Sequence, residues 1–311
     1  MHRKDGGPTR HPLLKLQALA VLLAAVPMTV PAQTDLDLRV MSFNVRYGTA
    51  DDGINSWPLR RDLVVRVIAD QAPDVLGMQE ALDFQLNELM SAIDGYGLIG
   101  VGRDDGRTRG EYAAILYRLD RLALEQTDTF WFSDTPEVPG STSWGNHITR
   151  ICTWARFVDR ESAVPFYVYN VHLDHESQDS RERSVELLAE RIALRTHPDP
   201  VIVTGDFNAG EQNSAMRFLR GEADRAWGES DTPPPSPNLI DTFRRVHPDA
   251  TETGTFNGFR GITSGERIDA VLVSRDWSVL DAAIVRTSSE GRYPSDHFPV
   301  LAVLQPNLGP Q

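Results

Sequence analysis

The feature that most constrains this sequence is a series of short apolar runs, rich in β-branched and aromatic residues, that recur along the chain. Runs of this length and composition predict β-strands. Segments with an apolar period of 3.6 residues lie between several of them and predict helices, as with Leu82, Leu86 and Leu89. The predicted strands are residues 38–45, 75–78, 113–117, 151–158, 166–173, 201–204, 268–273 and 298–304.

The order of these elements favours two packed sheets flanked by helices. Strands and helices alternate in the first half, but the second half is richer in strands than a strict βαβ array would be. The proline-rich stretch at residues 231–238 is interpreted as a long loop inside one domain, because chemically suggestive residues lie on both sides of it. We therefore predict a single α/β domain over residues 33–311.

The first 32 residues differ from the rest of the 311-residue chain. Four basic residues lead into an apolar stretch from Leu16 to Val26, and small residues suited to signal peptidase follow at Val30, Pro31 and Ala32. The apolar stretch is short for a membrane span, so residues 1–32 are interpreted as a cleaved export signal. A retained anchor is the alternative. The prediction is an exported protein, periplasmic or secreted, without a stable membrane anchor.

Charge and cysteine content exclude some classes of protein. The whole chain carries a formal net charge of −13, and the part after the leader has 27 basic and 43 acidic residues, a net charge of −16. A broad surface for nucleic acid needs clustered Lys and Arg, so such a surface is disfavoured, although a local basic cleft remains compatible. Cys152 is the only cysteine, which excludes an intramolecular disulfide.

Polar residues stand at the ends of six predicted strands. Each has an ordinary explanation, because Asn and Asp form turns and a single His often lies at a core boundary. Carboxylate, amide and imidazole groups at six strand ends together predict one site at an edge of the scaffold. The residues are Asn44, Glu80, Asn170, His172, Asp174, His175, Asp206, Asn208, Asp269, Asp296 and His297.

The stretch "PVIVTGDFNAG" is the clearest of these strand ends. Val201 and Val203 are expected to anchor the strand in the core. Gly205 is expected to leave room beside the site for a phosphate or a water molecule. Asp206 and Asn208, two residues apart on an extended chain, are expected to point to the same side.

The residue types suit one kind of chemistry. Oxygen ligands from Asn44 and Glu80 fit a hard cation such as Mg²⁺, which needs few protein carboxylates when a substrate phosphate is present. Asp206 is suited to orient or deprotonate a water molecule. His172 and His297 are suited to bond phosphoryl oxygens or a leaving group. No Ser, Cys or Lys stands out as a nucleophile, which favours direct attack by water.

The motifs "FNVR", "GMQE", "NVHLDH", "GDFNA", "RIDAVLVS" and "SDHFPV" follow one another in this order. As an ordered set they resemble the endonuclease/exonuclease/phosphatase superfamily, which includes deoxyribonucleases, abasic-site endonucleases, inositol polyphosphate 5-phosphatases, sphingomyelinases and deadenylases. The resemblance covers about residues 40–304. It implies a four-layer α/β/β/α sandwich of two packed mixed sheets flanked by helices, with a metal-dependent phosphoesterase site at one edge.

The resemblance also implies ligands for metal and substrate. Asn44 and Glu80 resemble the metal-binding pair of the family, with Asp296 as an additional ligand, and Mg²⁺ is the expected cofactor with Mn²⁺ as a substitute. Arg46 matches a substrate-binding arginine of the deoxyribonuclease branch. Abasic-site enzymes have an acid at that position, so a second metal ligand is absent here. Asn170 is assigned to substrate binding as well.

By the same resemblance the catalytic residues are Glu111, His172, Asp206, Asn208, Asp269 and His297. His172 resembles the histidine that assists the leaving group or contacts the phosphate. Asp206 resembles the carboxylate that aligns the attacking water, with Asn208 as its amide partner. Asp269 resembles the acid that orients the final histidine, His297. The glutamate in "RGEYAAILYR" resembles the one paired with the first histidine in the deoxyribonuclease branch.

Some alternatives remain open from sequence. The "HLDH" run offers three ligands in four residues, which would suit zinc, although His172 and His175 face opposite sides of a strand. Arg103, Arg107 and Arg109 would serve a nuclease cleft or a solvated loop equally well. The segment 141–150 is a substrate-facing loop or only a connection. The inositol 5-phosphatase branch is disfavoured, because its tryptophan before the Gly-Asp-x-Asn motif is absent.

The predicted function is that of an exported, Mg²⁺-dependent phosphoester hydrolase, a phosphodiesterase or phosphatase. Its partner is expected to be a small or headgroup-like phosphate ester rather than long nucleic acid. An extracytoplasmic endonuclease or exonuclease acting on DNA or RNA is the main alternative. A phosphate-ligand binding module without catalysis is the third interpretation, and the full set of polar residues argues against it. Family resemblance indicates the reaction class better than the substrate, because specificity depends on the loops around a shared site.

Overall fold

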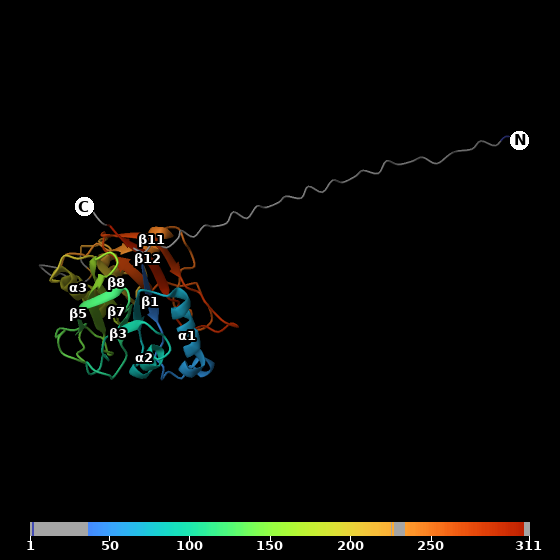
Figure 1. The fold of residues 1–311 in the computed structure, drawn as a ribbon, viewed down its shortest axis with the longest axis horizontal. Coiled ribbons are helices and arrows are strands. Elements are labelled where there is room, and N and C mark those ends of the chain that lie inside the picture. Colours follow the sequence, from blue (N-terminus) through green and yellow to red (C-terminus); the bar gives the residue numbers. More distant parts are fainter. Residues whose placement is uncertain (1, 3–36, 225, 227–233, 308–311) are drawn as a thin grey trace. The chain divides into compact units, whose positions relative to one another are not determined.

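The computed structural model describes residue 2, residues 37–224, residue 226 and residues 234–307, and its strands form two six-stranded sheets (Figure 1). The strands are β1 (Leu38–Asn44), β2 (Val75–Gln79), β3 (Tyr96–Ile99), β4 (Ala113–Arg118), β5 (Leu122–Trp131), β6 (Ile151–Asp159), β7 (Pro165–His172), β8 (Val201–Asp206), β9 (Ile240–Asp241), β10 (Asp269–Val273), β11 (Trp277–Ile284) and β12 (Val300–Pro306). The helices are η1 (Gly53–Asn55), α1 (Trp57–Gln71), α2 (Asp83–Met90), α3 (Gln178–Ala193), α4 (Ser214–Leu219) and α5 (Thr242–Val246).

Both sheets are mixed. The first sheet has the strand order β11–β12–β1–β2–β4–β3, and the second has the order β5–β6–β7–β8–β10–β9. Each contains one parallel pair, β1–β2 in the first and β7–β8 in the second, and antiparallel neighbours elsewhere. The carboxyl ends of parallel strands meet at the same edge of a sheet, so each sheet brings two strand ends together.

Alternation of side chains along the strands builds the layers. Inward residues such as Val40 of β1 and Val168 of β7 form the core between the two sheets. Outward residues of the first sheet, such as Met41, pack with residues of α1 and α2, whereas Tyr169 and its neighbours in the second sheet pack with α3 and α4. Figure 1 shows α1 and α2 on one side of the sheets and α3 on the other. The predicted four-layer α/β/β/α sandwich is confirmed.

Helix boundaries follow local sequence signals. Pro58 lies in the first turn of α1, where its missing N–H costs nothing, and Ala72 closes the helix in the left-handed conformation before Pro73. The side chain of Ser177 accepts a hydrogen bond from the backbone N–H of Ser180 and caps α3. The buried positions Val64, Val67 and Ile68 of α1 have the predicted helical period.

Four strands were not among those predicted: β3, β5, β9 and β11. All four are edge strands of the two sheets. The middle of β5 is exposed from Glu125 to Asp128, so its sequence does not have the continuous apolar run by which the central strands are recognised.

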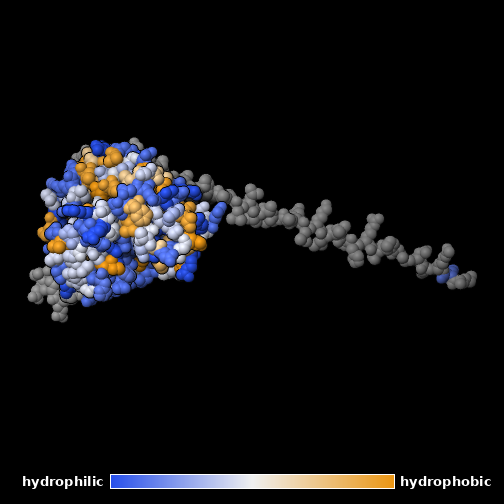
Figure 2. Space-filling view, turned by 90° about the horizontal axis from the view of Figure 1, so that it is seen from below, coloured by the Kyte–Doolittle hydropathy of each residue, from blue (hydrophilic) through white to orange (hydrophobic). Residues whose placement is uncertain are grey.

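The described residues from 37 to 307 belong to one unit that spans Thr34–Gln311. The predicted export signal, residues 1–32, lies outside the described residues, apart from His2. Among the helices of the described part, none is long and apolar enough to cross a bilayer. On the face shown in Figure 2, apolar side chains form small separate groups among hydrophilic ones.

Candidate active site

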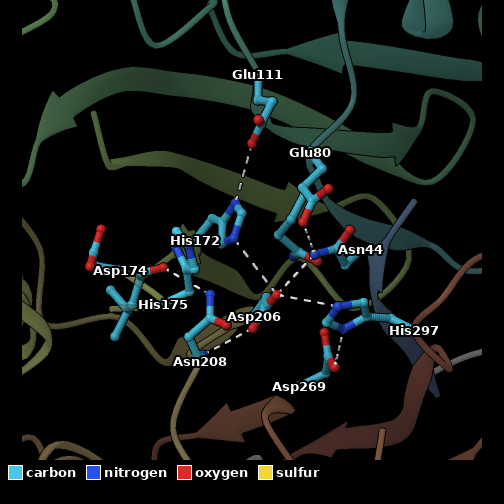
Figure 3. A network of polar contacts seen from close by, with 12 residues as sticks. Asn44, Glu80, Glu111, His172, Asp174, His175, Asp206, Asn208, Asp269 and His297 are labelled. Atoms are coloured by element: carbon cyan, nitrogen blue, oxygen red, sulfur yellow. Dashed lines mark hydrogen bonds and ion pairs between the residues drawn. The ribbon is translucent and has the colours of Figure 1, made fainter. Parts of the chain in front are cut away.

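The strand ends of both sheets surround a cavity of about 500 Å³. Strand register places them there: His172 pairs with Asp206 across β7–β8, and Asp206 pairs with Asp269 across β8–β10. Figure 3 shows the polar side chains that meet at this edge. The cavity is lined by Arg46, Tyr47, Glu80, Arg103, Glu111, Ile148, Arg150, His172, His175, Asp206, Asn208, Phe256, Ile268, Asp296 and His297.

Asp206 is the centre of the polar network (Figure 3). Its Oδ2 accepts a hydrogen bond of 2.9 Å from Asn44 Nδ2, and its Oδ1 accepts one of 2.9 Å from the backbone N–H of Asn208. The Nε2 atoms of His172 and His297 lie 3.7 and 3.9 Å from Oδ2. Burial raises the pKa of Asp206 to about 7, and the charge of Asp269 adds to this effect.

His297 is held by an acidic partner. Its Nδ1 lies 2.9 Å from an Asp269 carboxylate oxygen, and both side chains are buried. Burial disfavours the charged imidazolium, but the Asp269 and Asp206 carboxylates outweigh it and raise the pKa of His297 well above its usual value. His297 is therefore protonated at neutral pH, with Nδ1–H donated to Asp269.

His172, in contrast to His297, has a neutral ring. Burial lowers its pKa well below the usual value, and the nearby positive charges of Arg150 and Arg103 lower it further. In the neutral ring Nε2 accepts a hydrogen bond of 3.1 Å from Arg150 Nη1, while Nδ1 lies 3.8 Å from a carboxylate oxygen of Glu111. Two histidines on either side of one aspartate thus differ in protonation, which is the arrangement that separates acid and base roles.

Glu111 and Arg103 form a paired unit behind His172. Two guanidinium nitrogens of Arg103 donate to the two carboxylate oxygens of Glu111 at 2.7 and 2.8 Å. Arg103 is thereby occupied with an internal partner although it lines the cavity. Arg109 binds Asp105 instead and lies outside the cavity lining. The basic loop proposed from sequence therefore places one of its three arginines at the site.

Acidic and imidazole groups from both sheets form a candidate cation site. One ligand atom from each of Glu80, Asp206 and His297 lies within 4.8 Å of the others. Asn44 donates to both Glu80 and Asp206, so its amide lies between these two carboxylates. Asp296 is buried at the same cavity, 3.7 Å from Arg46 Nε. Oxygen donors at this density fit a hard divalent cation such as Mg²⁺.

Three residues at the site adopt a left-handed backbone, which costs energy for a side chain larger than glycine. They are Arg46, Glu80 and Asn208, with φ of 59°, 64° and 47°. Each directly or closely follows a strand, and the reversal turns the chain sharply away from the sheet. The strain is borne at the positions whose side chains meet at the cavity.

Asn170 does not belong to this group. It is fully buried between the sheets, where its Oδ1 accepts from Gln79 and Thr204. Its Nδ2 donates to the carbonyl oxygens of Met78 and Ala114. Both polar atoms are satisfied inside the protein, so the position supports a role in joining the sheets, not the predicted contact with substrate.

Gly205 also serves a different purpose from the one expected. A Cβ atom at this position would lie 2.4 Å from Val171 Cγ2 and 2.6 Å from the Val171 carbonyl oxygen. The glycine is required because β7 and β8 approach closely, and not to leave room beside the site. Phe207, which follows Asp206, is fully buried in the core behind the strand.

Arg150 is a site residue that lies in segment 141–150, which the sequence alone left open as a substrate-facing loop or only a connection. It is 3% exposed, lines the cavity, and bridges His172 and His175 with bonds of 3.1 and 2.8 Å. A guanidinium between the two imidazoles argues against zinc binding by the "HLDH" run. Trp144 and His147, from the same loop, do not line the cavity.

Phe256 was missed altogether. It lines the cavity with 51% of its surface exposed, and its ring contacts His297 edge-on, with 5.2 Å between ring centroids. An exposed phenylalanine beside a buried polar site is a signal that only the tertiary structure provides, because the sequence places it in a loop without other polar residues of the site.

The packed mixed sheets, with carboxylates, amides and imidazoles at one edge, define a phosphoester hydrolase of the α/β sandwich type. The chain belongs to the endonuclease/exonuclease/phosphatase family, whose model matches residues 41–297.

Solved structures and a curated relative agree with this assignment. An endonuclease/exonuclease/phosphatase from Bacteroides vulgatus is 32% identical, with a TM-score of 0.77, over 87% of this chain and 99% of that one. A mannosyl-6-phosphatase from Bacteroides thetaiotaomicron is 31% identical, with a TM-score of 0.75, over 86% of this chain and 99% of that one. An uncharacterized protein of Acanthamoeba polyphaga mimivirus is 30% identical over 185 residues, which is 56% of this chain and 68% of the relative.

Proposed function

We propose that the protein is an exported, Mg²⁺-dependent hydrolase of small phosphate esters, with phosphorylated sugars as the favoured class. The observation that carries the proposal is the position of Asp206 between a neutral His172 and a protonated His297, each within 4 Å of its carboxylate. Water activation and charge stabilisation are thus provided at one point. Family membership supports the reaction class.

The residues of the site have separate roles in this reaction. Asp206 orients the attacking water and takes its proton, and Asn208 holds the position of Asp206 through its backbone N–H. Protonated His297 donates from Nε2 to the phosphoryl group as negative charge develops, with Asp269 fixing the ring. Arg150 adds positive charge beside His172. Within the described part of the chain, the cavity lining contains no Ser, Thr, Cys or Lys, which favours water as the nucleophile.

The cation would be held by the carboxylates of Glu80 and Asp206, with Asn44 and Asp296 beside them, while protonated His297 has no free lone pair and faces the phosphoryl group instead. When bound, Mg²⁺ supplies Lewis-acid stabilisation of the phosphoryl oxygens. Binding of the cation at Asp206 is compatible with the raised pKa of this group, because a nearby positive charge favours the carboxylate form.

A small substrate is supported by the cavity and the charges. The cavity of about 500 Å³ is of the size that holds a small organic ligand. Arg103 is bound to Glu111, and the part of the chain after the leader carries a net charge of −16, so little free positive charge is available for a long polyanion. The exposed ring of Phe256 offers a flat surface for a sugar ring. The mannosyl-6-phosphatase neighbour supports this class further.

The experiment that tests the proposal is a substrate panel with purified protein and Mg²⁺. The panel contains sugar phosphates, nitrophenyl phosphate, bis(nitrophenyl) phosphate, nucleotides, inositol phosphates, phospholipid headgroups and supercoiled plasmid. We expect phosphate release from sugar phosphates at the highest kcat/KM. Efficient plasmid nicking that is abolished by His172→Ala would establish the nuclease alternative instead. No hydrolysis with Mg²⁺ or Mn²⁺ would favour a phosphate-binding protein.

Export is proposed from the leader at residues 1–32. Expression of the full chain in a bacterial host, followed by fractionation and mass measurement of the product, tests this directly. We expect a periplasmic or secreted product shortened by 32 residues. A full-length product in the membrane fraction would establish a retained anchor.

A further inference from the structure

Arg60, in the first turns of α1, is 1% exposed and contacts three separate loops. We propose that Arg60 is a positioning residue for the reaction proposed above, which holds the chain at the end of β1, with Asn44 and Arg46, against the loop carrying Asp296 and His297. The first segment follows β1 and the second precedes β12, so they lie near opposite ends of the first sheet's sequence.

The guanidinium group of Arg60 donates to four backbone carbonyl oxygens. Nη1 donates to Val45 at 2.5 Å and to Pro294 at 3.0 Å, so one nitrogen joins positions 249 residues apart in the chain. Nη2 donates to Arg46 at 2.8 Å, and Nε donates to Asn55 at 2.9 Å. Three of these carbonyls lie within two residues of Asn44, Arg46 or Asp296.

Two aromatic rings hold the guanidinium plane. Its central carbon lies 5.1 Å from the centroid of the Trp57 ring and 5.6 Å from that of Phe259. Burial lowers the pKa of Arg60 to about 10, and the nearby charges of Asp296 and Asp52 oppose this change. Arg60 therefore remains protonated at neutral pH and keeps all its donors.

A packing role alone does not explain this arrangement. A buried cation bonded to neutral carbonyls costs more desolvation than an apolar side chain of the same volume. The benefit of the arginine is a fixed geometry, because the planar guanidinium group has five N–H donors and holds several acceptors in position at once. A lysine, a point charge on a flexible stem, cannot reproduce the fork.

The loop after β1 depends on this support. Arg46 has a left-handed backbone at φ 59°, a conformation that persists only when its surroundings impose it. Its carbonyl oxygen accepts from both Arg60 Nη2 and Gln85 Nε2, at 2.8 and 3.1 Å. The same fork holds Pro294, two residues before Asp296, whose Oδ2 lies 3.7 Å from Arg46 Nε. Arg60 thus sets the separation of the two sides of the cation site.

The test compares Arg60→Met and Arg60→Lys with Val64→Ala, a core truncation one turn further along the same helix at a fully buried position. Each variant is purified as the full chain. The values of kcat, KM and Tm are then measured with saturating Mg²⁺ and the best substrate of the panel. The nuclear magnetic resonance signal of the His297 Nδ1 proton, bonded to Asp269, is recorded as well. This signal does not require turnover.

We expect Arg60→Met to lower kcat by about 10- to 100-fold at a temperature well below its Tm, with KM changed by less than about threefold. Its His297 Nδ1 signal is expected to broaden or shift. Val64→Ala is expected to lower Tm with kcat and the Nδ1 signal unchanged. Arg60→Lys is expected to fold and to lose about fivefold or more in kcat, because it keeps the charge but not the fork.

A loss of kcat in Arg60→Met no larger than in Val64→Ala, or an unchanged Nδ1 signal, would overturn the inference. If Arg60→Met does not fold, Arg60→Lys decides the question, and a kcat within about twofold of the wild type would overturn it. If the wild type hydrolyses no phosphoester, the proposed function fails, while the Nδ1 signal still shows whether Arg60 positions the loop of His297.

Discussion

The Nδ1 atom of His297 lies 2.9 Å from the Asp269 carboxylate, although Asp269 begins a strand of the second sheet and His297 precedes β12 of the first. The bond therefore joins the two halves of the site across the sandwich. It also accounts for the raised pKa of His297, because a buried imidazole gains its proton only beside negative charge.

Replacement of this partner is expected to impair catalysis more than folding. Asp269→Asn keeps the shape but removes the charge that orients and protonates His297, so we expect kcat to fall by about 10²- to 10⁴-fold. The measurement is kcat with saturating Mg²⁺ and substrate. Asp281→Asn, the same change at an exposed position of β11, serves as the control and is expected to be neutral. Equal activity of the two variants would contradict the role of the pair.

Asp206→Asn is expected to give a folded protein with almost no activity. An amide cannot accept the proton of the attacking water, and we expect a loss of about 10²-fold or more in kcat. The metal-free variant is expected to fold with a Tm that depends less on pH than that of the wild type, because the amide does not titrate, although it keeps only one acceptor oxygen for the N–H groups of Asn44 and Asn208. Calorimetry in EDTA measures this. Asp62→Asn, on the exposed face of α1, is the matched control.

The stability of the metal-free protein is expected to fall as the pH rises. Burial raises the folded-state pKa of Asp206 to about 7, and Asp269 and Asp206 raise that of His297, so both bind protons more tightly in the folded state. Their stabilisation is present at low pH; the contribution of Asp206 is lost as the pH rises through about 7, and that of His297 is lost as the pH rises from about 6.5 through its higher folded-state pKa. His172, with a lowered pKa, destabilises the fold only below about pH 6.5, where the unfolded imidazole gains its proton.

The measurement is Tm in EDTA between about pH 6.5 and about pH 8.5, where the neutral His172 contributes little. The decrease is expected to be smaller in Asp206→Asn, which does not titrate. Adding Mg²⁺ is expected to raise Tm more at the higher pH, because the cation competes with protons for the same carboxylates. A wild-type Tm that rises over this range would show that the raised pKa values are wrong.

Metal dependence is expected to be centred on Glu80. Its Oε1 accepts from Asn44 and its Oε2 from the backbone N–H of Tyr47, so the carboxylate is already oriented toward the site. We expect EDTA to abolish activity and Mg²⁺ or Mn²⁺ to restore it. Glu80→Gln is expected to raise the Mg²⁺ concentration for half-maximal activity by about 10-fold or more. Full activity in EDTA would refute the metal-dependent mechanism.

Phe256 is expected to act on substrate preference. Phe256→Ala removes the exposed ring at the cavity wall, and we expect KM for sugar phosphates to rise by about 3- to 10-fold, the range of a single aromatic contact. Activity on a short alkyl phosphate, which has no ring to pack, is expected to change little. Comparison of kcat/KM for the two substrates measures the effect, and an equal loss on both would place Phe256 in support of His297 instead.

The sequence by itself determined the central strands and the polar groups at their ends. Strands such as β1 and β8 are buried over nearly their whole length, so their sequences are largely apolar and end in Asn44 and Asp206. The four edge strands were not predicted, because an edge strand exposes side chains to water and has the mixed composition of a loop, as in the middle of β5.

Only the tertiary structure decided which polar residues meet and in which charge state. Asn170 has the same local pattern as the site residues, but its position between the sheets directs both polar atoms to internal partners. Arg150 and Phe256 reach the cavity because loops distant in sequence fold against it. The opposite pKa shifts of His172 and His297 depend on neighbours from other strands, since burial and charge act through space and not along the chain.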